Sequence, residues 1–258
     1  MANTALITGA SSGIGRELAL YHASKGGDVV ITARRKPELE TLKAEIEKDK
    51  GVKVHVFAID LASKGGPEKL YNAVKKAGLQ VDILINNAGF GGRGVHVERD
   101  LDQEMAMIDL NVKSLVELTH RFAADMVNQG GGKILNVGST AGFMPGPLQA
   151  IYFATKAFVN SFSQAIDQEL RDKGVTCTVL APGYVETEFA QVADLEGTLL
   201  VSAKGAKAKD VARVGYNGMR AKQLFVINDA LLNVMVNWIV PLLPRRLVLK
   251  MIARSQRK

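Results

Sequence analysis

Short apolar runs alternate with longer amphipathic stretches along almost the whole chain. The apolar runs are typical of buried strands, and they cover about residues 3–8, 28–33, 53–59, 82–86, 133–138, 175–181 and 223–228. Between them, apolar positions recur at helical spacing over about residues 14–26, 37–49, 67–78, 99–111, 113–128, 150–172 and 207–221. This alternation predicts an α/β fold in which helices cover both faces of a parallel sheet.

The end of the chain departs from this alternation. Residues 230–243 are apolar apart from two asparagines, and they include Trp238. Interrupted by Pro241 and Pro244, the stretch is too short to span a bilayer. We expect residues 230–258 to form a helix whose apolar face, including Trp238, covers a pocket mouth or a neighbouring subunit. A membrane surface is the alternative partner of the same face.

The positive charge is concentrated in the same segment. Of the formal net charge of +7, six charges belong to residues 230–258, which contain no acidic residue. The basic residues are Arg245, Arg246, Lys250, Arg254, Arg257 and Lys258. A nucleic-acid-binding protein carries a basic face on its fold, so no nucleic-acid partner is predicted.

The remaining composition is that of an ordinary globular domain. A chain of 258 residues with 47% hydrophobic and 23% charged residues fits one α/β domain. The single cysteine, Cys177, lies in an apolar run and indicates a buried strand residue and a reducing compartment. The scattered histidines have no metal-ligand spacing, so no metal site is predicted. Without a basic region before the first strand, a cytoplasmic location is expected.

A glycine-rich turn joins the first predicted strand to the first predicted helix. The strand ends at Thr8 and runs into Gly9-Ala10-Ser11-Ser12-Gly13-Ile14-Gly15. Glycines allow a close backbone approach, and the helix N-terminus supplies free N–H groups and a positive dipole. The turn therefore predicts a phosphate cradle, with the spacing Thr-Gly-x-x-x-Gly-x-Gly.

A tyrosine and a lysine share one face of the predicted helix 150–172. Tyr152 and Lys156 are four residues apart, and Ser139 lies thirteen residues upstream. A nearby ammonium group lowers the pKa of a tyrosine, so the phenol can exchange a proton near neutral pH. Ser139 would hold a substrate oxygen beside the phenol. Because Tyr-x-x-x-Lys also occurs by chance on helices, the other motifs decide between these interpretations.

In combination, the motifs resemble those of the classical short-chain dehydrogenases/reductases. They follow the family order between residues 3 and 190, and they are Thr8–Gly15, Asp60, Asn86-Asn87-Ala88-Gly89, Asn111, Ser139, Tyr152 with Lys156, and Pro182-Gly183. The resemblance implies a single Rossmann-like, doubly wound domain over residues 1–258. It also implies a seven-stranded parallel sheet in the order 3-2-1-4-5-6-7, and a substrate lid at residues 188–222. A plain surface connection is the alternative for the lid.

The resemblance implies a catalytic tetrad of Asn111, Ser139, Tyr152 and Lys156. Tyr152 would transfer a proton to or from the substrate oxygen that Ser139 positions. Lys156 would lower the tyrosine pKa and hold the nicotinamide ribose. The backbone carbonyl of Asn111 would anchor a water between Lys156 and bulk solvent, and a helix kink is the alternative for this residue.

The resemblance also implies cofactor contacts at the ends of several strands. Asp60 would meet the adenine edge, or cap the next helix. Val185 and Thr187 would bind the nicotinamide carboxamide. The full set of predicted cofactor-binding residues is Gly9, Ser11, Ser12, Gly13, Ile14, Gly15, Arg34, Arg35, Asp60, Leu61, Asn87, Ala88, Gly89, Tyr152, Lys156, Pro182, Gly183, Val185 and Thr187.

Two arginines follow the second predicted strand. In a site that prefers NAD, an acidic residue here would accept from the ribose 2′-hydroxyl. Arg34 and Arg35 can instead hold a 2′-phosphate, with Arg34 as the better candidate, and Ser11 or Ser12 can add a hydroxyl. The sequence therefore predicts NADP(H) as the cofactor. A solvated pair before Pro37 is the alternative.

These observations predict an NADP(H)-dependent oxidoreductase that interconverts a ketone or aldehyde and its alcohol. The apolar lid and C-terminal segment favour a lipophilic substrate of the steroid, retinoid or acyl-chain type. The alternatives are a catalytically silent nucleotide-binding sensor and a peripheral membrane reductase of lipid substrates. The resemblance further implies a homodimer through the helices near residues 105–126 and 150–170.

Overall fold

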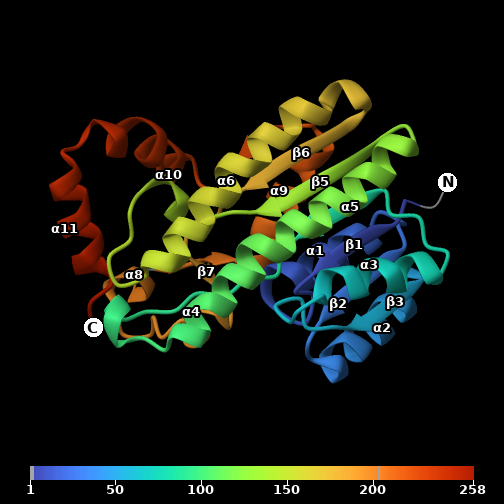
Figure 1. Ribbon diagram of the computed structural model, residues 1–258, viewed down its shortest axis with the longest axis horizontal. Coiled ribbons are helices and arrows are strands. Elements are labelled where there is room, and N and C mark those ends of the chain that lie inside the picture. The colour runs from blue at the N-terminus through green and yellow to red at the C-terminus, as the bar shows by residue number, and fades with distance from the viewer. Residues whose placement is uncertain (1–2, 203) are drawn as a thin grey trace.

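The computed structural model describes residues 3–202 and 204–258 (Figure 1). Its centre is a seven-stranded sheet in which all paired strands run parallel. The strands are β1 (Ala5–Thr8), β2 (Val29–Ala33), β3 (Val54–Ala58), β4 (Ile83–Asn86), β5 (Gly132–Val137), β6 (Val175–Leu180) and β9 (Phe225–Val226). They are arranged in the order β3-β2-β1-β4-β5-β6-β9, so the predicted order is confirmed, with β9 as the seventh strand.

Helices cover both faces of this sheet (Figure 1). One face packs against α1 (Gly13–Ala23), α2 (Lys36–Lys50) and α9 (Ala208–Arg220). The other face packs against α3 (Gly66–Lys76), α5 (Leu115–Asn128) and α6 (Ala150–Leu170). Successive strand residues point to opposite faces, so Ile7 belongs to the first apolar cluster and Leu6 to the second. Burial on both faces explains why the strands read as continuous apolar runs.

The helical stretch after β4 differs from the prediction of two separate helices. Here α4 (Leu101–Ile108) continues through a π-helical segment, Asp109–Ser114, directly into α5. The widened turn contains Asn111, whose side chain bonds to the backbone of Phe90. Asparagine is a poor residue for the interior of an α-helix, and here it lies in a π-bulge instead. Such bulges are often found at functional sites.

The expectation of a single helix at the end of the chain is wrong. The structure forms α10 (Ala230–Val234), a π-helical segment Met235–Ile239, a 3₁₀ turn Val240–Leu242 and α11 (Arg245–Ser255). Pro241 and Pro244 have no N–H to continue the helical hydrogen bonding, so the direction changes between α10 and α11. Trp238 is 72% exposed and does not line the cavity described below.

The remaining elements are short. They are β7 (Val185–Glu186), α7 (Phe189–Val192), α8 (Leu199–Ser202), β8 (Ala206–Lys207) and the 3₁₀ turns His96–Glu98, Thr140–Phe143 and Arg171–Lys173. Because α9 packs into the core, it cannot belong to a mobile segment. We therefore propose that the lid is confined to the part of residues 188–222 that precedes α9. Across residues 3–202 and 204–258, the structure contains no helix long and apolar enough to cross a membrane.

Candidate active site

A cavity of about 590 Å³ opens at the carboxyl ends of the strands. It extends to either side of the neighbouring strands β1 and β4 at the middle of the sheet. In a doubly wound sheet, this is the point where the strand order reverses and ligands bind. The cavity is lined by every predicted site residue except Gly15 and Asn111. The predicted residues in its wall are Gly9, Ser11, Ser12, Gly13, Ile14, Arg34, Arg35, Asp60, Leu61, Asn87, Ala88, Gly89, Ser139, Tyr152, Lys156, Pro182, Gly183, Val185 and Thr187.

The glycine turn fits closely between its neighbours. Gly9 and Gly13 have φ angles of 66° and 55°, in the left-handed region that favours glycine. A Cβ atom on Gly15 would lie 2.3 Å from the carbonyl oxygen of Gly9, so no side chain fits there. Gly15 therefore packs against the backbone of the turn on the side away from the cavity, and other residues of the turn line the cavity.

Asn87 braces this turn from the neighbouring strand. Its Nδ2 donates to the carbonyl oxygens of Thr8, at 2.9 Å, and of Gly9, at 3.2 Å. The hydroxyl of Thr8 accepts from the backbone N–H groups of Asn87 and Ala88. Asn86 connects β4 to β5, because its Nδ2 donates to Asn136 Oδ1 at 2.9 Å. The two asparagines thus hold the ends of β1, β4 and β5 in register.

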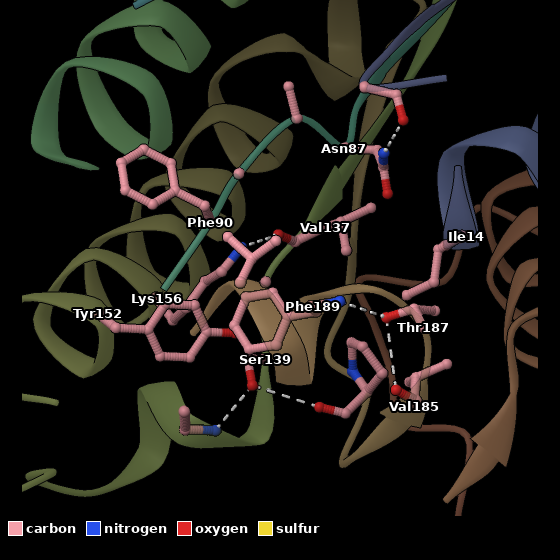
Figure 2. A pocket seen from close by; sticks show the side chains of 18 of the residues that line it. Ile14, Asn87, Phe90, Val137, Ser139, Tyr152, Lys156, Val185, Thr187 and Phe189 are labelled. Atoms are coloured by element: carbon pink, nitrogen blue, oxygen red, sulfur yellow. Dashed lines mark hydrogen bonds between the residues drawn. The ribbon is translucent and has the colours of Figure 1, made fainter. Parts of the chain in front are cut away.

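Ser139, Tyr152 and Lys156 lie together in the wall of the cavity (Figure 2). Ser139 follows β5, and its Oγ accepts from Ala141 N at 3.1 Å and donates to the Pro182 carbonyl at 3.3 Å. Tyr152 and Lys156 occupy successive turns of α6. Lys156 Nζ donates to the Val137 carbonyl at 2.8 Å and lies 5.8 Å from the centre of the Tyr152 ring.

Burial sets the proton affinities of this group. It raises the pKa of Tyr152 from 10.0 to about 12, an effect that the neighbouring Ser139 hydroxyl partly opposes. It lowers the pKa of Lys156 from 10.5 to about 8. In the protein alone the pKa of Tyr152 is raised, so the lowered value predicted from the Tyr152–Lys156 spacing is not found there. Desolvation disfavours the charged form of each side chain, which raises the pKa of the phenol and lowers that of the ammonium group.

Raising the pH should stabilise the protein relative to a Lys156→Met variant. Between the folded pKa of about 8 and the usual 10.5, the unfolded chain holds more protons at Lys156 than the folded chain. The free energy of unfolding therefore rises with pH across this window, by about 3 kcal/mol in total. Below pH 8, Lys156 is protonated in both states, so its contribution does not change with pH. Urea unfolding of both proteins from pH 7 to 10 measures the change, since Met has no such proton. A pH-independent difference would contradict the burial effect.

Asn111 lies behind the cavity rather than in its wall. Its Oδ1 accepts from Phe90 N at 3.1 Å, and its Nδ2 donates to the Phe90 carbonyl at 2.9 Å and to Thr155 Oγ1 at 3.2 Å. The side chain thus connects the loop after β4 to α6, one residue before Lys156. This contact positions Lys156 and leaves the proposed role of the Asn111 carbonyl as a prediction.

Arg34 and Arg35 both reach the rim of the cavity, but their surroundings differ. Arg35 forms an ion pair with Glu188 at 2.8 Å and donates to Ser11 Oγ at 3.2 Å. Among the described residues, Arg34 makes no ion pair or side-chain hydrogen bond. Its guanidinium therefore has donors to offer a ligand, whereas those of Arg35 are shared with a carboxylate.

The sequence did not identify the apolar half of the cavity in full. The centre of the Phe189 ring lies 5.2 Å from the centre of the Tyr152 ring. Further apolar wall residues come from the predicted lid and from the end of the chain, and they are Val192, Leu195, Leu200, Leu232, Val236 and Ile252. Gln149 and Gln256 also line the cavity, both buried, with Gln149 Nε2 donating to Gln256 Oε1 at 2.6 Å. No local pattern marked this pair, because its members are 107 residues apart.

The family follows from a comparison with known sequences. A model of the family described as short chain dehydrogenase matches residues 3–196. The chain belongs to the short-chain dehydrogenase family. The protein is therefore an oxidoreductase of this type, and its relatives act in carbonyl and alcohol chemistry.

Three relatives illustrate the range of these similarities. Over 194 residues, the chain is 39% identical to sulfoacetaldehyde reductase of Chromohalobacter salexigens, covering 74% of this chain and 76% of the relative. It is 36% identical to human very-long-chain 3-oxoacyl-CoA reductase, covering 73% of this chain and 61% of the relative. A short-chain dehydrogenase from Sphingobium yanoikuyae, solved in complex with NADPH, superposes with a TM-score of 0.84 at 31% identity, covering 90% of each chain.

Proposed function

We propose that this short-chain dehydrogenase is an NADP(H)-dependent reductase of lipophilic ketones or aldehydes. One observation carries the proposal. A single cavity joins a glycine-rich phosphate cradle, two arginines and a Ser139–Tyr152–Lys156 group to an apolar chamber. The first three features suit a phosphorylated dinucleotide and a proton transfer, and the chamber suits an apolar substrate body.

The residues present fit NADP(H). A Cβ atom on Gly13 would lie 3.1 Å from Thr187 Cγ2, so the glycine turn packs closely against the residue that follows β7. Helix α1 begins at Gly13, and the free N–H groups of its first turn would bind a phosphate. Arg34 would hold the 2′-phosphate, with Ser11 or Arg35 beside it. The solved relative from Sphingobium yanoikuyae binds NADPH.

The bound cofactor would supply the hydride, and the protein supplies the rest. With its pKa raised to about 12, the Tyr152 phenol keeps its proton at neutral pH and can donate it to the oxygen of a carbonyl under reduction. The Ser139 hydroxyl would hold that oxygen. Lys156 would favour the phenolate left behind, since an ammonium group near the ring stabilises negative charge.

The apolar chamber supports a lipophilic substrate. Its wall is formed by aliphatic and aromatic side chains from α7, α8, α10, α11 and the residues beside them, such as Phe189, Leu195, Leu232 and Ile252. One relative is named for very-long-chain 3-oxoacyl-CoA and another for the small, charged sulfoacetaldehyde. The chamber favours the first kind of substrate, because a sulfonate would lose its hydration there without a partner.

A substrate panel tests the proposal. We expect NADPH oxidation with ketones or aldehydes that carry a steroid, retinoid or long acyl body, and at least about tenfold lower kcat/KM for short polar aldehydes such as sulfoacetaldehyde. Rates followed at 340 nm with each carbonyl compound measure this preference. Equal or better turnover of the polar aldehydes would contradict the lipophilic assignment, and no turnover of any carbonyl would contradict the reductase.

We further propose a homodimer that pairs through α5 and α6. Both helices expose side chains on the surface away from the sheet, and Phe158 is 40% exposed there. Sedimentation of the purified protein would show a species of twice the 27.8 kDa chain mass.

A further inference from the structure

An apolar stripe lies on the outer side of the segment 230–258, which we define as the C-terminal arm. Leu231, Val234, Trp238 and Leu242 follow one another at spacings of three and four residues through α10, the π-helical segment and the 3₁₀ turn. Their exposed fractions are 73%, 48%, 72% and 85%. Several large exposed apolar side chains within one short segment mark an interaction surface.

The inner side of the arm belongs to the cavity. Leu232, Val236 and Ile252 line the apolar chamber, and buried Gln256 bonds to Gln149 next to α6. In Figure 1 the arm forms an arch at one end of the molecule, beyond α6 and α8. Its outer side therefore faces away from the sheet, and only the thickness of the arm separates that side from the cavity.

A basic row lies on α11, the second helical part of the arm. Arg246, Lys250 and Arg254 recur every four residues and are exposed, so they form one row on the helix. Leu247 and Met251 follow them by one position and are also exposed. The arm contains no acidic residue, so its exposed side chains are apolar, positive or, at Asn233 and Asn237, uncharged and polar. This combination is typical of helices that lie in a membrane interface.

We propose that the outer side of the C-terminal arm docks on a bilayer that contains anionic phospholipids. Trp238 and Leu242 would enter the interfacial region, where tryptophan is favoured, and the basic row would contact lipid phosphates. A second copy of this chain fits the surface less well. A two-fold contact would place the same surface on both partners and bring the two basic rows face to face.

Trp238 provides the test, because it is the only tryptophan of the chain. Vesicles of phosphatidylcholine with phosphatidylserine should shift its emission to shorter wavelength, and lipids brominated on the acyl chain should quench it. The protein should float with these vesicles, and about 0.5 M salt should weaken the binding because it screens the charges. Fluorescence and flotation do not require turnover, so their results do not depend on whether the proposed reductase activity is correct.

Matched charge variants identify the surface. Arg246→Glu with Lys250→Glu should weaken binding to the vesicles at least about tenfold. Lys48→Glu with Lys50→Glu makes the same charge change on exposed residues of α2, at the other end of the molecule (Figure 1), and should bind nearly as the unaltered protein does. All four residues are exposed, so circular dichroism should show unchanged folding.

Three results would overturn the proposal. One is unchanged Trp238 emission with phosphatidylserine vesicles. Another is equal binding to pure phosphatidylcholine, or equal weakening by both pairs of variants. The third is a shift of the emission with protein concentration in the absence of vesicles, which would show that a second copy covers the arm.

Discussion

Replacing Tyr152 by Phe should reduce turnover by about 10²–10⁴-fold while leaving NADPH binding nearly unchanged. The substitution keeps the ring, which packs with its centre 5.2 Å from that of Phe189, and removes only the hydroxyl. That hydroxyl is the protonated donor beside Ser139, and burial keeps its pKa at about 12. Steady-state rates with a carbonyl substrate and NADPH titration by fluorescence measure the two effects separately.

Tyr184→Phe is the matched control, because Tyr184 also lines the cavity and the substitution likewise removes a phenol hydroxyl. It should retain turnover within a few-fold of the unaltered enzyme. If Tyr152→Phe kept near-normal turnover, or if Tyr184→Phe lost as much, the proton would have another donor and the proposed mechanism would be wrong.

The fold was predictable because its signal is local. Each strand is buried on both faces and reads as an apolar run, and each helix carries an apolar face, so the alternation is visible residue by residue. The order of the strands, in contrast, required the family resemblance. The π-bulge at Asn111 escaped prediction because it depends on the backbone of Phe90, which only the folded chain brings near.

The site was predictable at its cofactor end and less so at its substrate end. The glycine turn and the tyrosine–lysine pair are short motifs whose members lie within a few residues. The apolar chamber is assembled from α7, α8, α10, α11 and the residues beside them, which are far apart in the sequence. The Gln149–Gln256 contact likewise joins residues that no spacing relates. The error on the tyrosine pKa has a similar origin, because the degree of burial depends on the packed structure and not on the spacing of Tyr152 and Lys156.

The arm shows how composition can suggest a surface without giving its shape. Its apolar and basic character was visible in the sequence, but the prolines divide it into two helical parts. Within the first part, Leu232 and Val236 line the cavity, whereas Trp238 is exposed. A single helix with Trp238 on its inner side would have hidden the surface proposed to meet lipid.

Replacing Arg34 by Asp should shift the cofactor preference from NADPH toward NADH by about tenfold or more. The change removes a guanidinium that lines the cavity rim and adds an acceptor for a ribose 2′-hydroxyl. A hydrogen bond to a charged group contributes about 1.5–3 kcal/mol, which corresponds to this factor. The ratio of kcat/KM for NADPH and NADH, measured with one carbonyl substrate, gives the shift.

Two further variants separate the role of Arg34 from a general effect of charge. Arg35→Ala should change the ratio less, because the Arg35 guanidinium is already shared with Glu188 at 2.8 Å. Lys36→Asp makes the same change in charge as Arg34→Asp on an exposed neighbour that does not line the cavity, so it should leave the ratio within about twofold. An unchanged ratio in Arg34→Asp, or an equal shift in Lys36→Asp, would show that Arg34 does not contact the 2′-phosphate. A larger shift in Arg35→Ala would move that role to Arg35 and imply that its pairing with Glu188 breaks when the nucleotide binds.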